Sequence, residues 1–320
     1  MPLLKHLPED FIVEELSTVP ELKPGPYHYV YLSKKTYPTM KACQIIADAI
    51  HVPLASIGFA GNKDKQAVTK QLISIKTTRD ITSLLERFKT GDLTLEYIGT
   101  GADAVVLGHL RGNRFSIVVR QLIEEQPKLL TRFVNFFGDQ RFSKNNSAIG
   151  KLLVKQQFKE ALALIDNPLA QKYLEEHPAN AVDALRQIPK QLLKMYVHAY
   201  QSMFFNKTVT ALLNGKKDDV PNIMVPLVGF GYECDNAEID AIIKKLLDEE
   251  GITERDFIIR PLPDISCEGG ERALFADIHD LEIGPLEDDD LHPDMKKCTL
   301  IFWLDKGCYA TEAVKQMIEN

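Results

Sequence analysis

The 320-residue sequence has few cysteines, and they form no pattern that would hold a metal or a disulfide framework. The five cysteines are odd in number, widely spaced and never arranged as C-x-x-C. None of the eight histidines belongs to an H-E-x-x-H pattern, so a histidine-built zinc site is disfavoured too. We therefore expect neither a disulfide-rich fold nor a metal cofactor.

Long apolar runs are also missing. The longest, residues 300–304, is far too short to cross a bilayer. The first residues, MPLLKHLPEDF, contain prolines and acids where a secretory signal needs an unbroken apolar segment. Because 45% of the residues are hydrophobic and 26% are charged, the composition is that of a soluble globular protein. The length of 320 residues suits one large domain or two ordinary ones, and we expect about two. We expect a cytoplasmic protein that does not contact membranes.

A phosphate-binding loop is absent as well, although residues 61–71, GNKDKQAVTKQ, have some likeness to one. Such a loop needs glycines that face the anion and a lysine followed by Ser or Thr, whereas Lys63 is followed by Asp64. Gly229 and Gly231 begin a G-x-G pattern, but Cys234 stands in place of the third glycine of a dinucleotide site. A nucleotide-dependent enzyme is therefore disfavoured.

The net charge of −7 hides an uneven distribution along the chain. Residues 1–150 carry 19 basic and 15 acidic residues, whereas residues 151–320 carry 19 and 30. The basic excess is concentrated in residues 61–79 and in residues 108–120, which contain three arginines and no acid. Such patches attract a polyanion even on an acidic protein, although ordinary solvated strand residues explain them equally well.

Hydrophobic periodicity predicts strands at both ends of the chain and helices in its middle. Tyr27, Tyr29 and Tyr31 alternate with Val30 and Leu32, as expected of a strand covered on both faces. The predicted strands are residues 11–16, 27–32, 71–76, 93–98, 115–120 and 299–304, with strand signals continuing to residue 311. A helix is predicted from residue 38, and residues 146–250 are mainly helical, the last helix being capped by Gly251. This order indicates a sheet domain interrupted by a helical insertion.

Asp64 is the first candidate for chemistry, although a lone acid in a tight turn is usually a surface or capping residue. Elsewhere, RGNRF (residues 111–115) combines two guanidinium groups, an amide and an aromatic ring at the start of a predicted strand. These groups suit phosphates, base edges and stacked bases respectively. Taken alone, Asn113 could equally fill a turn and Phe115 could belong to the core.

Five segments together resemble the TruD family of tRNA pseudouridine synthases, and they occur in the order found in that family. They are LPEDFIVEE (residues 7–15), AGNKDKQAVTKQ (60–71), RGNRF (111–115), NFFGDQRF (135–142) and FWLDKGCYAT (302–311). The chain departs from the family at Ser143, which replaces a usual Gly, and at Asp305 and Cys308, which replace a usual Pro and Ser. These departures concern local loop shape rather than the chemistry.

The resemblance implies an α+β fold with two domains. A mixed, largely antiparallel sheet of the pseudouridine synthase type would form the catalytic domain, residues 1–145 and 269–320. A mainly helical TRUD domain, residues 146–268, would be inserted into it. The insertion is acidic overall, so only limited basic strips of it are expected to contact RNA, with candidates Lys151, Lys155, Lys190 and Lys194.

The resemblance also implies that Asp64 is the nucleophile in the isomerisation of a tRNA uridine, at position 13, to pseudouridine. Phe11, Phe115 and Tyr309 would line the pocket, and Asn113 would hydrogen-bond the base or its neighbour. Phe11 as a core strand residue and Tyr309 as a packed loop aromatic are the open alternatives.

Lys5 aligns with a basic residue of the first family motif and is the candidate charge partner that keeps Asp64 ionised. Lys63 would instead point to phosphate. The reaction needs no cofactor and no metal. We expect tRNA as the partner and a monomeric enzyme.

The competing hypothesis is a non-catalytic RNA-binding or tRNA-folding protein on the same scaffold. Asp64 favours the enzyme, because an Asn or Gly at this position would have favoured the binding protein.

Overall fold

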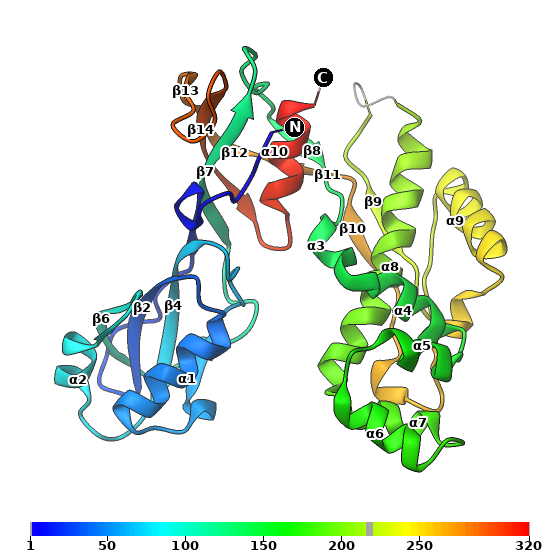
Figure 1. Ribbon diagram of the computed structural model, residues 1–320, viewed down its shortest axis with the longest axis horizontal. Helices are drawn as coiled ribbons and strands as arrows, with labels where there is room; N and C mark the ends of the chain where they lie inside the picture. The colour runs from blue at the N-terminus through cyan, green and yellow to red at the C-terminus, as the bar shows by residue number, and fades with distance from the viewer. Residues whose placement is uncertain (1, 216–219, 320) are drawn as a thin grey trace. The chain divides into compact units, whose positions relative to one another are not determined.

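The computed structural model describes residues 2–215 and 220–319. Its strands are β1 (Phe11–Leu16), β2 (Tyr27–Lys35), β3 (Ile57–Phe59), β4 (Val68–Lys76), β5 (Lys89–Thr90), β6 (Leu93–Gly101), β7 (Gly112–Leu122), β8 (Arg132–Val134), β9 (Met224–Leu227), β10 (Gly270–Ala273), β11 (Phe275–Asp277), β12 (His279–Ile283), β13 (Glu287–Asp288) and β14 (Lys296–Asp305). Its helices are α1 (Thr39–Ile50), α2 (Thr82–Arg87), α3 (Asp139–Phe142), α4 (Asn146–Val154), α5 (Phe158–Leu164), α6 (Pro168–Glu176), α7 (Ala181–Leu185), α8 (Lys190–Leu213), α9 (Ala237–Glu250) and α10 (Ala310–Ile318). Figure 1 labels most of them.

The chain divides into two compact units. The first contains Met1–Phe133 and Ala276–Asn320, and the second contains Val134–Phe275. The insertion predicted from the sequence, residues 146–268, falls within the second unit.

The first unit is built on one mixed sheet. In the described part of the chain, its strands follow the order β12-β14-β7-β1-β4-β2-β6-β5, with β13 paired to β14 and β3 to β4 (Figure 1). The pair β1 and β4 is parallel, and its neighbours β7 and β2 pair antiparallel. The predicted α+β class with a largely antiparallel sheet is therefore confirmed.

The two faces of this sheet follow from the register of its central strands. Phe11, Val13 and Glu15 of β1 share one face, because successive strand residues alternate between faces. Phe115 of β7 lies opposite Val13, and Asn113 lies opposite Glu15, so both point to the same side. We call this side the Phe11 face, and we call the opposite side the Leu72 face after a residue of β4.

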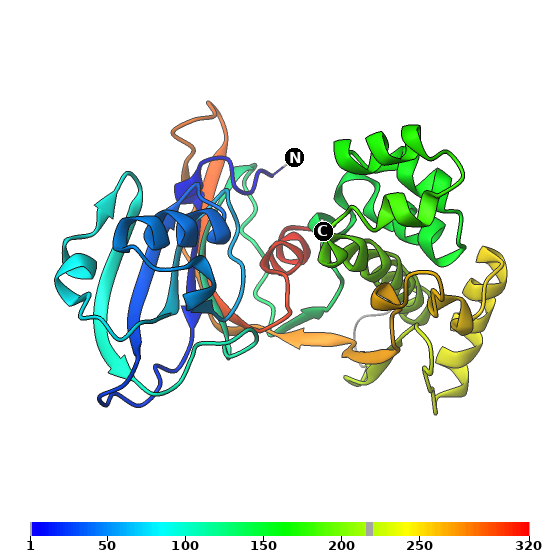
Figure 2. The ribbon, with the colours of Figure 1, turned by 90° about the horizontal axis from the view of Figure 1, so that it is seen from below.

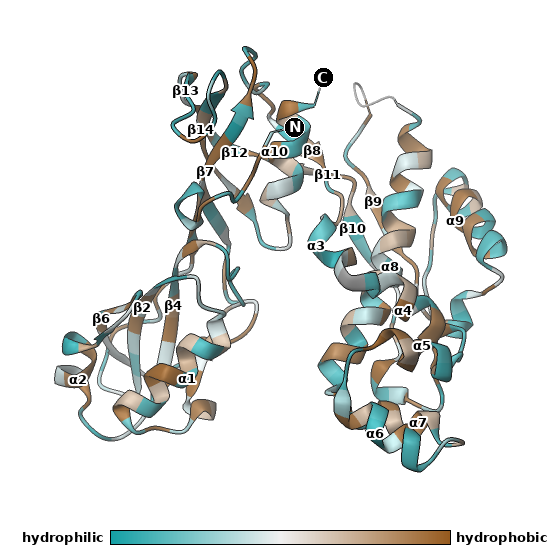
Figure 3. Ribbon diagram, viewed as in Figure 1, coloured by the Kyte–Doolittle hydropathy of each residue, from teal (hydrophilic) through white to brown (hydrophobic). Residues whose placement is uncertain are grey.

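Two helices cover the Phe11 face at different strands. Apolar side chains of α1 pack on β2 and β4, and apolar side chains of α10 pack on β7 and β14. The apolar residues of β4 and α1 appear as brown segments in Figure 3. The predicted alternation of β2 is confirmed, because Val30 and Leu32 belong to the α1 core whereas Tyr27, Tyr29 and Tyr31 pack on the Leu72 face.

The second unit is a helical assembly around α8. Helices α4 and α9 both pack on α8 (Figures 1 and 2), and its aromatic side chains Tyr200, Phe204 and Phe205 are completely buried in one apolar core. The predicted end of α9 is confirmed: Gly251 has a φ of 64°, a left-handed conformation that glycine adopts without strain.

The C-terminal segment differs from the prediction. Residues after β14 form a turn at Gly307, and α10 then runs from Ala310 to Ile318, where strand signals had been expected to continue to residue 311. Ala310, Ala313, Val314 and Met317 recur at helical spacing and are buried against the sheet. Among the described helices, none has the length and apolar character that crossing a membrane requires.

Candidate active site

Asp64 lies in the loop between β3 and β4, and side chains from two rigid elements fix that loop. Thr39 Oγ1, at the start of α1, accepts a hydrogen bond from the Lys63 amide at 2.9 Å. Gln71 Nε2 of β4 donates to the Gly61 carbonyl at 3.1 Å, and Thr39 donates to Gln71 Oε1 at 3.2 Å. Because Thr39 and Gln71 are both buried, the backbone before Asp64 has little freedom to move.

A buried ammonium group holds the same loop. Lys34 of β2 is 1% exposed, and its Nζ donates to the carbonyl of Asp64 at 2.9 Å and to that of Lys63 at 3.4 Å. Burial lowers the pKa of Lys34 to about 8, and the negative charge of Asp64 opposes that shift. Lys34 is therefore charged at neutral pH and places positive charge beside Asp64.

Lys5 provides the second cation. Its Nζ lies 2.5 Å from Asp64 Oδ2, and the two side chains are 20% and 29% exposed. The same ammonium lies 4.1 Å from the centre of the Phe11 ring, within the range of a cation–π contact. The backbone of Lys5 is left-handed, with a φ of 58°, which is uncommon for a residue with a side chain. The structure thus brings together three of the residues selected from the sequence.

The segment that carries Lys5 is held at both of its ends by one residue. The backbones of Leu3 and Arg120 exchange two hydrogen bonds of 2.9 and 3.0 Å. The Arg120 guanidinium binds both carboxylate oxygens of Asp10, at 2.8 and 2.9 Å. Since Lys5 lies between these two attachments, its unusual backbone conformation is fixed by β7.

The environment of Arg120 corrects the interpretation of the second basic patch. Arg120 also binds Asp289 at 2.8 Å and Asp290 at 2.9 Å, and it is 5% exposed. It therefore cannot contribute to a surface that attracts a polyanion. Arg111 and Arg114, from the same patch, are exposed.

Three aromatic rings lie side by side on the Phe11 face. The rings of Phe11 and Phe115 are 6.0 Å apart in an edge-to-face arrangement, and Phe115 and Phe302 are 5.6 Å apart. Phe11 is 3% exposed and Phe115 is 7% exposed, so both rings belong to the core. Phe11 also contacts Lys5, and Phe115 contacts Phe11. Little of either ring is therefore accessible to a nucleotide.

Asn113 lies between Glu15 of β1 and Leu304 of β14 in the sheet register. Its side-chain oxygen is buried and has no hydrogen-bond partner among the described residues. A buried amide oxygen without a donor is costly, which makes it a candidate to accept a hydrogen bond from a ligand.

Tyr309 is the residue that precedes α10 and is partly buried. The helix that it introduces packs on the Phe11 face, the side of the sheet that also carries Phe11, Phe115 and Asn113. Its assignment to the pocket stays a prediction.

Sequence reasoning missed a buried ion pair beside the loop. Lys63 was expected to point to phosphate, but its Nζ lies 2.5 Å from Glu15 Oε2, and both side chains are buried. The pattern of β1 contained the signal, since Phe11, Val13 and Glu15 share one face and an inward-facing acid needs a buried partner. This ion pair anchors Lys63, the residue directly before Asp64, to β1.

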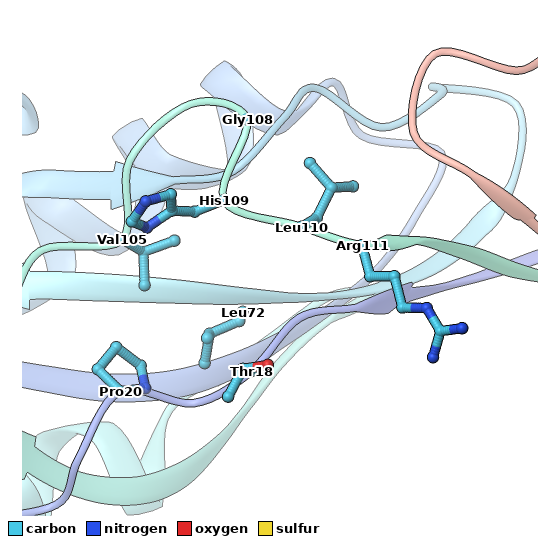
Figure 4. Close-up of a pocket in the computed structure, with 8 residues that line it drawn as sticks. All are labelled: Thr18, Pro20, Leu72, Val105, Gly108, His109, Leu110 and Arg111. Carbon is cyan, nitrogen blue, oxygen red and sulfur yellow. The ribbon is translucent and has the colours of Figure 1, made fainter.

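The Leu72 face carries a separate cavity of about 320 Å³ in the same unit (Figure 4). Its lining residues are Thr18, Pro20, Leu72, Val105, Gly108, His109, Leu110 and Arg111. Because Leu72 points away from Thr69 and Gln71, this cavity is on the side of the sheet opposite the residues that hold the Asp64 loop. Within the described residues, no group of three or more histidine, cysteine or acidic side chains is arranged to hold a metal ion.

The arrangement as a whole is a partly exposed carboxylate that contacts the Lys5 ammonium, in a loop whose backbone carbonyls bind the Lys34 ammonium. The partial exposure of Asp64 leaves its carboxylate accessible to a substrate. Such a carboxylate can attack or stabilise an electron-poor sugar carbon without the help of a metal.

Comparison with known proteins gives consistent matches along the chain. A family model described as tRNA pseudouridine synthase D (TruD) matches residues 2–172, 168–221 and 216–317. A protein of Nanoarchaeum equitans named "Probable tRNA pseudouridine synthase D" is 30% identical and covers 98% of each chain. The tRNA pseudouridine synthase D of Aquifex aeolicus is 26% identical over 98% of this chain and 97% of its own.

The fold is similar to that of a solved structure. A crystal structure of a TruD protein from Methanosarcina mazei matches with a TM-score of 0.75 and 25% identity. The match covers 98% of this chain and 93% of that one.

Proposed function

Since the chain belongs to the TruD family of tRNA pseudouridine synthases and is itself such an enzyme, we propose that it isomerises uridine 13 of tRNA, with Asp64 as the nucleophile. The observation that supports this role is the contact of the partly exposed Asp64 carboxylate with the Lys5 ammonium, 2.5 Å away. The same family membership favours the enzyme over a non-catalytic RNA-binding protein.

The reaction is balanced without any co-reactant. The bond between N1 of the base and C1′ of the ribose breaks, the base turns, and C5 forms the new bond to C1′. The proton on C5 is released and N1 gains a proton, so the product is an isomer of the substrate. Asp64 takes part either by forming an adduct at C1′ or through the glycal route, and both routes use the same carboxylate.

The target uridine has to leave its stack to reach Asp64, which costs a few kcal/mol. Stacking on aromatic side chains returns about 1–3 kcal/mol per base. We assign Tyr309 to this stacking contact, and the small exposed parts of Phe11 and Phe115 to the lining of the pocket. Asn113 accepts a hydrogen bond from the base or its neighbour, which would satisfy its buried oxygen.

The direct test is an assay with unmodified tRNA transcript and no added metal or nucleotide. We expect pseudouridine at position 13 from the wild-type protein, no product from Asp64→Ala, and normal product from the control Asp92→Ala, which changes an exposed acid. A transcript with cytidine at position 13 should yield nothing.

Three results would contradict parts of the proposal. Turnover by a correctly folded Asp64→Ala variant removes the assigned nucleophile. Product at another position removes the assignment of position 13. Tight binding of tRNA with no isomerisation on any transcript would favour the tRNA-folding alternative.

A further inference from the structure

The NFFGDQRF segment belongs to the second unit, and no step of the proposed reaction uses it. Asn206 of α8 holds it in place: the Phe137 amide donates to Asn206 Oδ1 at 2.9 Å, and Asn206 Nδ2 donates to the Phe137 carbonyl at 2.9 Å. The Phe137 ring also meets Phe205 of α8 edge to face, at 5.4 Å. The segment is therefore a rigid attachment on α8 rather than a free loop.

Arg141, near the end of this segment, is oriented by the same ring. Its guanidinium carbon lies 5.5 Å from the centre of the Phe137 ring, and its carbonyl accepts a hydrogen bond from buried Asn146. The Nε of Arg141 is buried and has no hydrogen-bond partner among residues 2–215 and 220–319. A guanidinium donor left unsatisfied in a buried position is costly, so a missing acceptor is indicated.

Two further basic groups lie on α8, the helix that packs against α3, which contains Arg141. Lys194 and His198 are one helical turn apart and share a face of α8. Lys194 is exposed, and within the described chain neither it nor Arg141 forms an ion pair with an acid. Helix α3 packs on α8, and the charges of Arg141 and Lys194 both act on His198, so the three groups are near one another.

Three other lysines of this unit behave differently. Lys151 and Lys207 both bind Glu250, at 2.7 and 3.2 Å. Lys244 binds Asp240 at 2.6 Å. These lysines are neutralised within the fold, whereas Arg141 and Lys194 are not.

We propose that Arg141, Lys194 and His198 form a subsite for a backbone phosphate of the tRNA substrate. This inference rests on the proposed function and adds a binding contact in the second unit. A guanidinium offers a planar fork of donors, and an ammonium and an imidazole add donors from the helix, a combination suited to the three-oxygen surface of a phosphate. The Phe137 ring fixes the guanidinium in advance, so less rotamer entropy is lost on binding.

The electrostatics of His198 agree with an anion site. Burial lowers the pKa of His198, and the positive charges of Arg141 and Lys194 lower it further. The lowered pKa favours the neutral imidazole, which still offers an N–H donor, while Arg141 and Lys194 remain two cations whose repulsion a bound phosphate would relieve.

The experiment is the salt dependence of tRNA affinity, because each phosphate contact contributes a fixed amount to the slope of log K against log salt concentration. We expect the double variant of Lys194→Gln and Arg141→Gln, which removes both cations from one phosphate, to reduce that slope by about 0.7–0.9, and Lys194→Gln alone to reduce it by part of that amount. Lys244→Gln, which removes a paired lysine, is the matched control and should leave the slope unchanged.

Lys194 is exposed, so its replacement should leave the unit folded and the measurement interpretable. An unchanged slope in both variants would overturn the subsite. The same conclusion follows if Lys194→Gln lowers the free energy of unfolding without changing tRNA affinity, because the partner would then be a protein carboxylate. Pseudouridine formation by the wild-type protein is measured in parallel, so that loss of the subsite is not confused with failure of the proposed function.

Discussion

Two clusters of charge in the first unit share the N-terminal segment but differ in enclosure. The Asp64 cluster consists of Asp64, Lys5 and Lys34, and the carboxylate of Asp64 is 29% exposed. The Arg120 cluster consists of Arg120 and its partners Asp10, Asp289 and Asp290. There the guanidinium and two of its three carboxylates, those of Asp10 and Asp289, are almost completely buried.

This difference in burial distinguishes a carboxylate that can react from carboxylates that stabilise the fold. A carboxylate whose hydrogen-bonding capacity is used up within a buried network cannot approach a substrate, and its removal damages the fold. A carboxylate that is paired but partly exposed, such as that of Asp64, can still contact a substrate. Both clusters join acids to basic residues distant in sequence, so burial rather than composition distinguishes them.

The largest expected effect is on stability, in the Arg120 cluster. Arg120→Met leaves buried Asp10 and Asp289 without their cation, and we expect it to lower the free energy of unfolding by about 3–5 kcal/mol. Urea unfolding followed by circular dichroism measures this. Arg87→Met, which changes an exposed arginine of α2, should have no comparable effect. A loss below 1 kcal/mol would show that the cluster is not a support.

The same cluster should respond to acid. Hydrogen bonds from Lys297 and Arg120 lower the pKa of Asp290 to about 2, and the pKa of Asp289 is also lowered, since its hydrogen bonds outweigh burial. A depressed carboxyl pKa stabilises the native state above the unfolded pKa of about 4, and that contribution is lost as the pH falls toward 2. The acid dependence of stability should therefore be shallower in Arg120→Met.

The next effect is on the rate, in the Asp64 cluster. Lys34→Met removes the donor to the carbonyls of Asp64 and Lys63, and we expect kcat to fall about 10–100-fold while KM stays within a factor of about two. Lys41→Met, an exposed lysine of α1, is the control and should leave kcat unchanged. An equal loss from both variants, or a change confined to KM, would contradict a role of Lys34 in positioning Asp64.

The pH dependence of this site has opposite signs for rate and stability. The pKa of Lys34 is lowered to about 8, below its unfolded value of about 10.4, so its contribution to stability rises between pH 8 and 10.4. Loss of the positive charge beside Asp64 should nevertheless reduce kcat above pH 8. In Lys34→Met, the pH profile of kcat should therefore show no such decrease above pH 8.

The sequence allowed the strands and the Asp64 loop to be predicted, but not which charged residues pair with one another in the two clusters. Alternation along β2 identified which residues share a face, and the motif around Asp64 identified the loop. The position of α10 was missed, because its apolar residues follow directly on the strand signals of β14. Local periodicity could not decide where the strand ends.

Long-range pairing explains the remaining differences. Lys63 and Arg120 were both grouped with surface cations, yet each meets an acid brought to it by the sheet register or by a distant loop: Glu15 and Asp289. Charge counts along the chain carry no information about such contacts. Lys5 was selected through family resemblance, and its contact with Asp64 depends on a left-handed backbone that the residue type does not indicate.

The smallest expected effect concerns an exposed ion pair, which extends the comparison of the two clusters to charges at the surface. Lys70 of β4 binds Glu96 at 2.7 Å, but the side chains are 39% and 63% exposed, so solvent screens the pair. Exposed pairs contribute about 0–1 kcal/mol, and we expect Lys70→Gln to change the free energy of unfolding by less than about 0.5 kcal/mol. Urea unfolding at low and high salt would measure this alongside Arg120→Met. A loss of several kcal/mol from Lys70→Gln would mean that the number of ion pairs, rather than their enclosure, determines which charges support the fold.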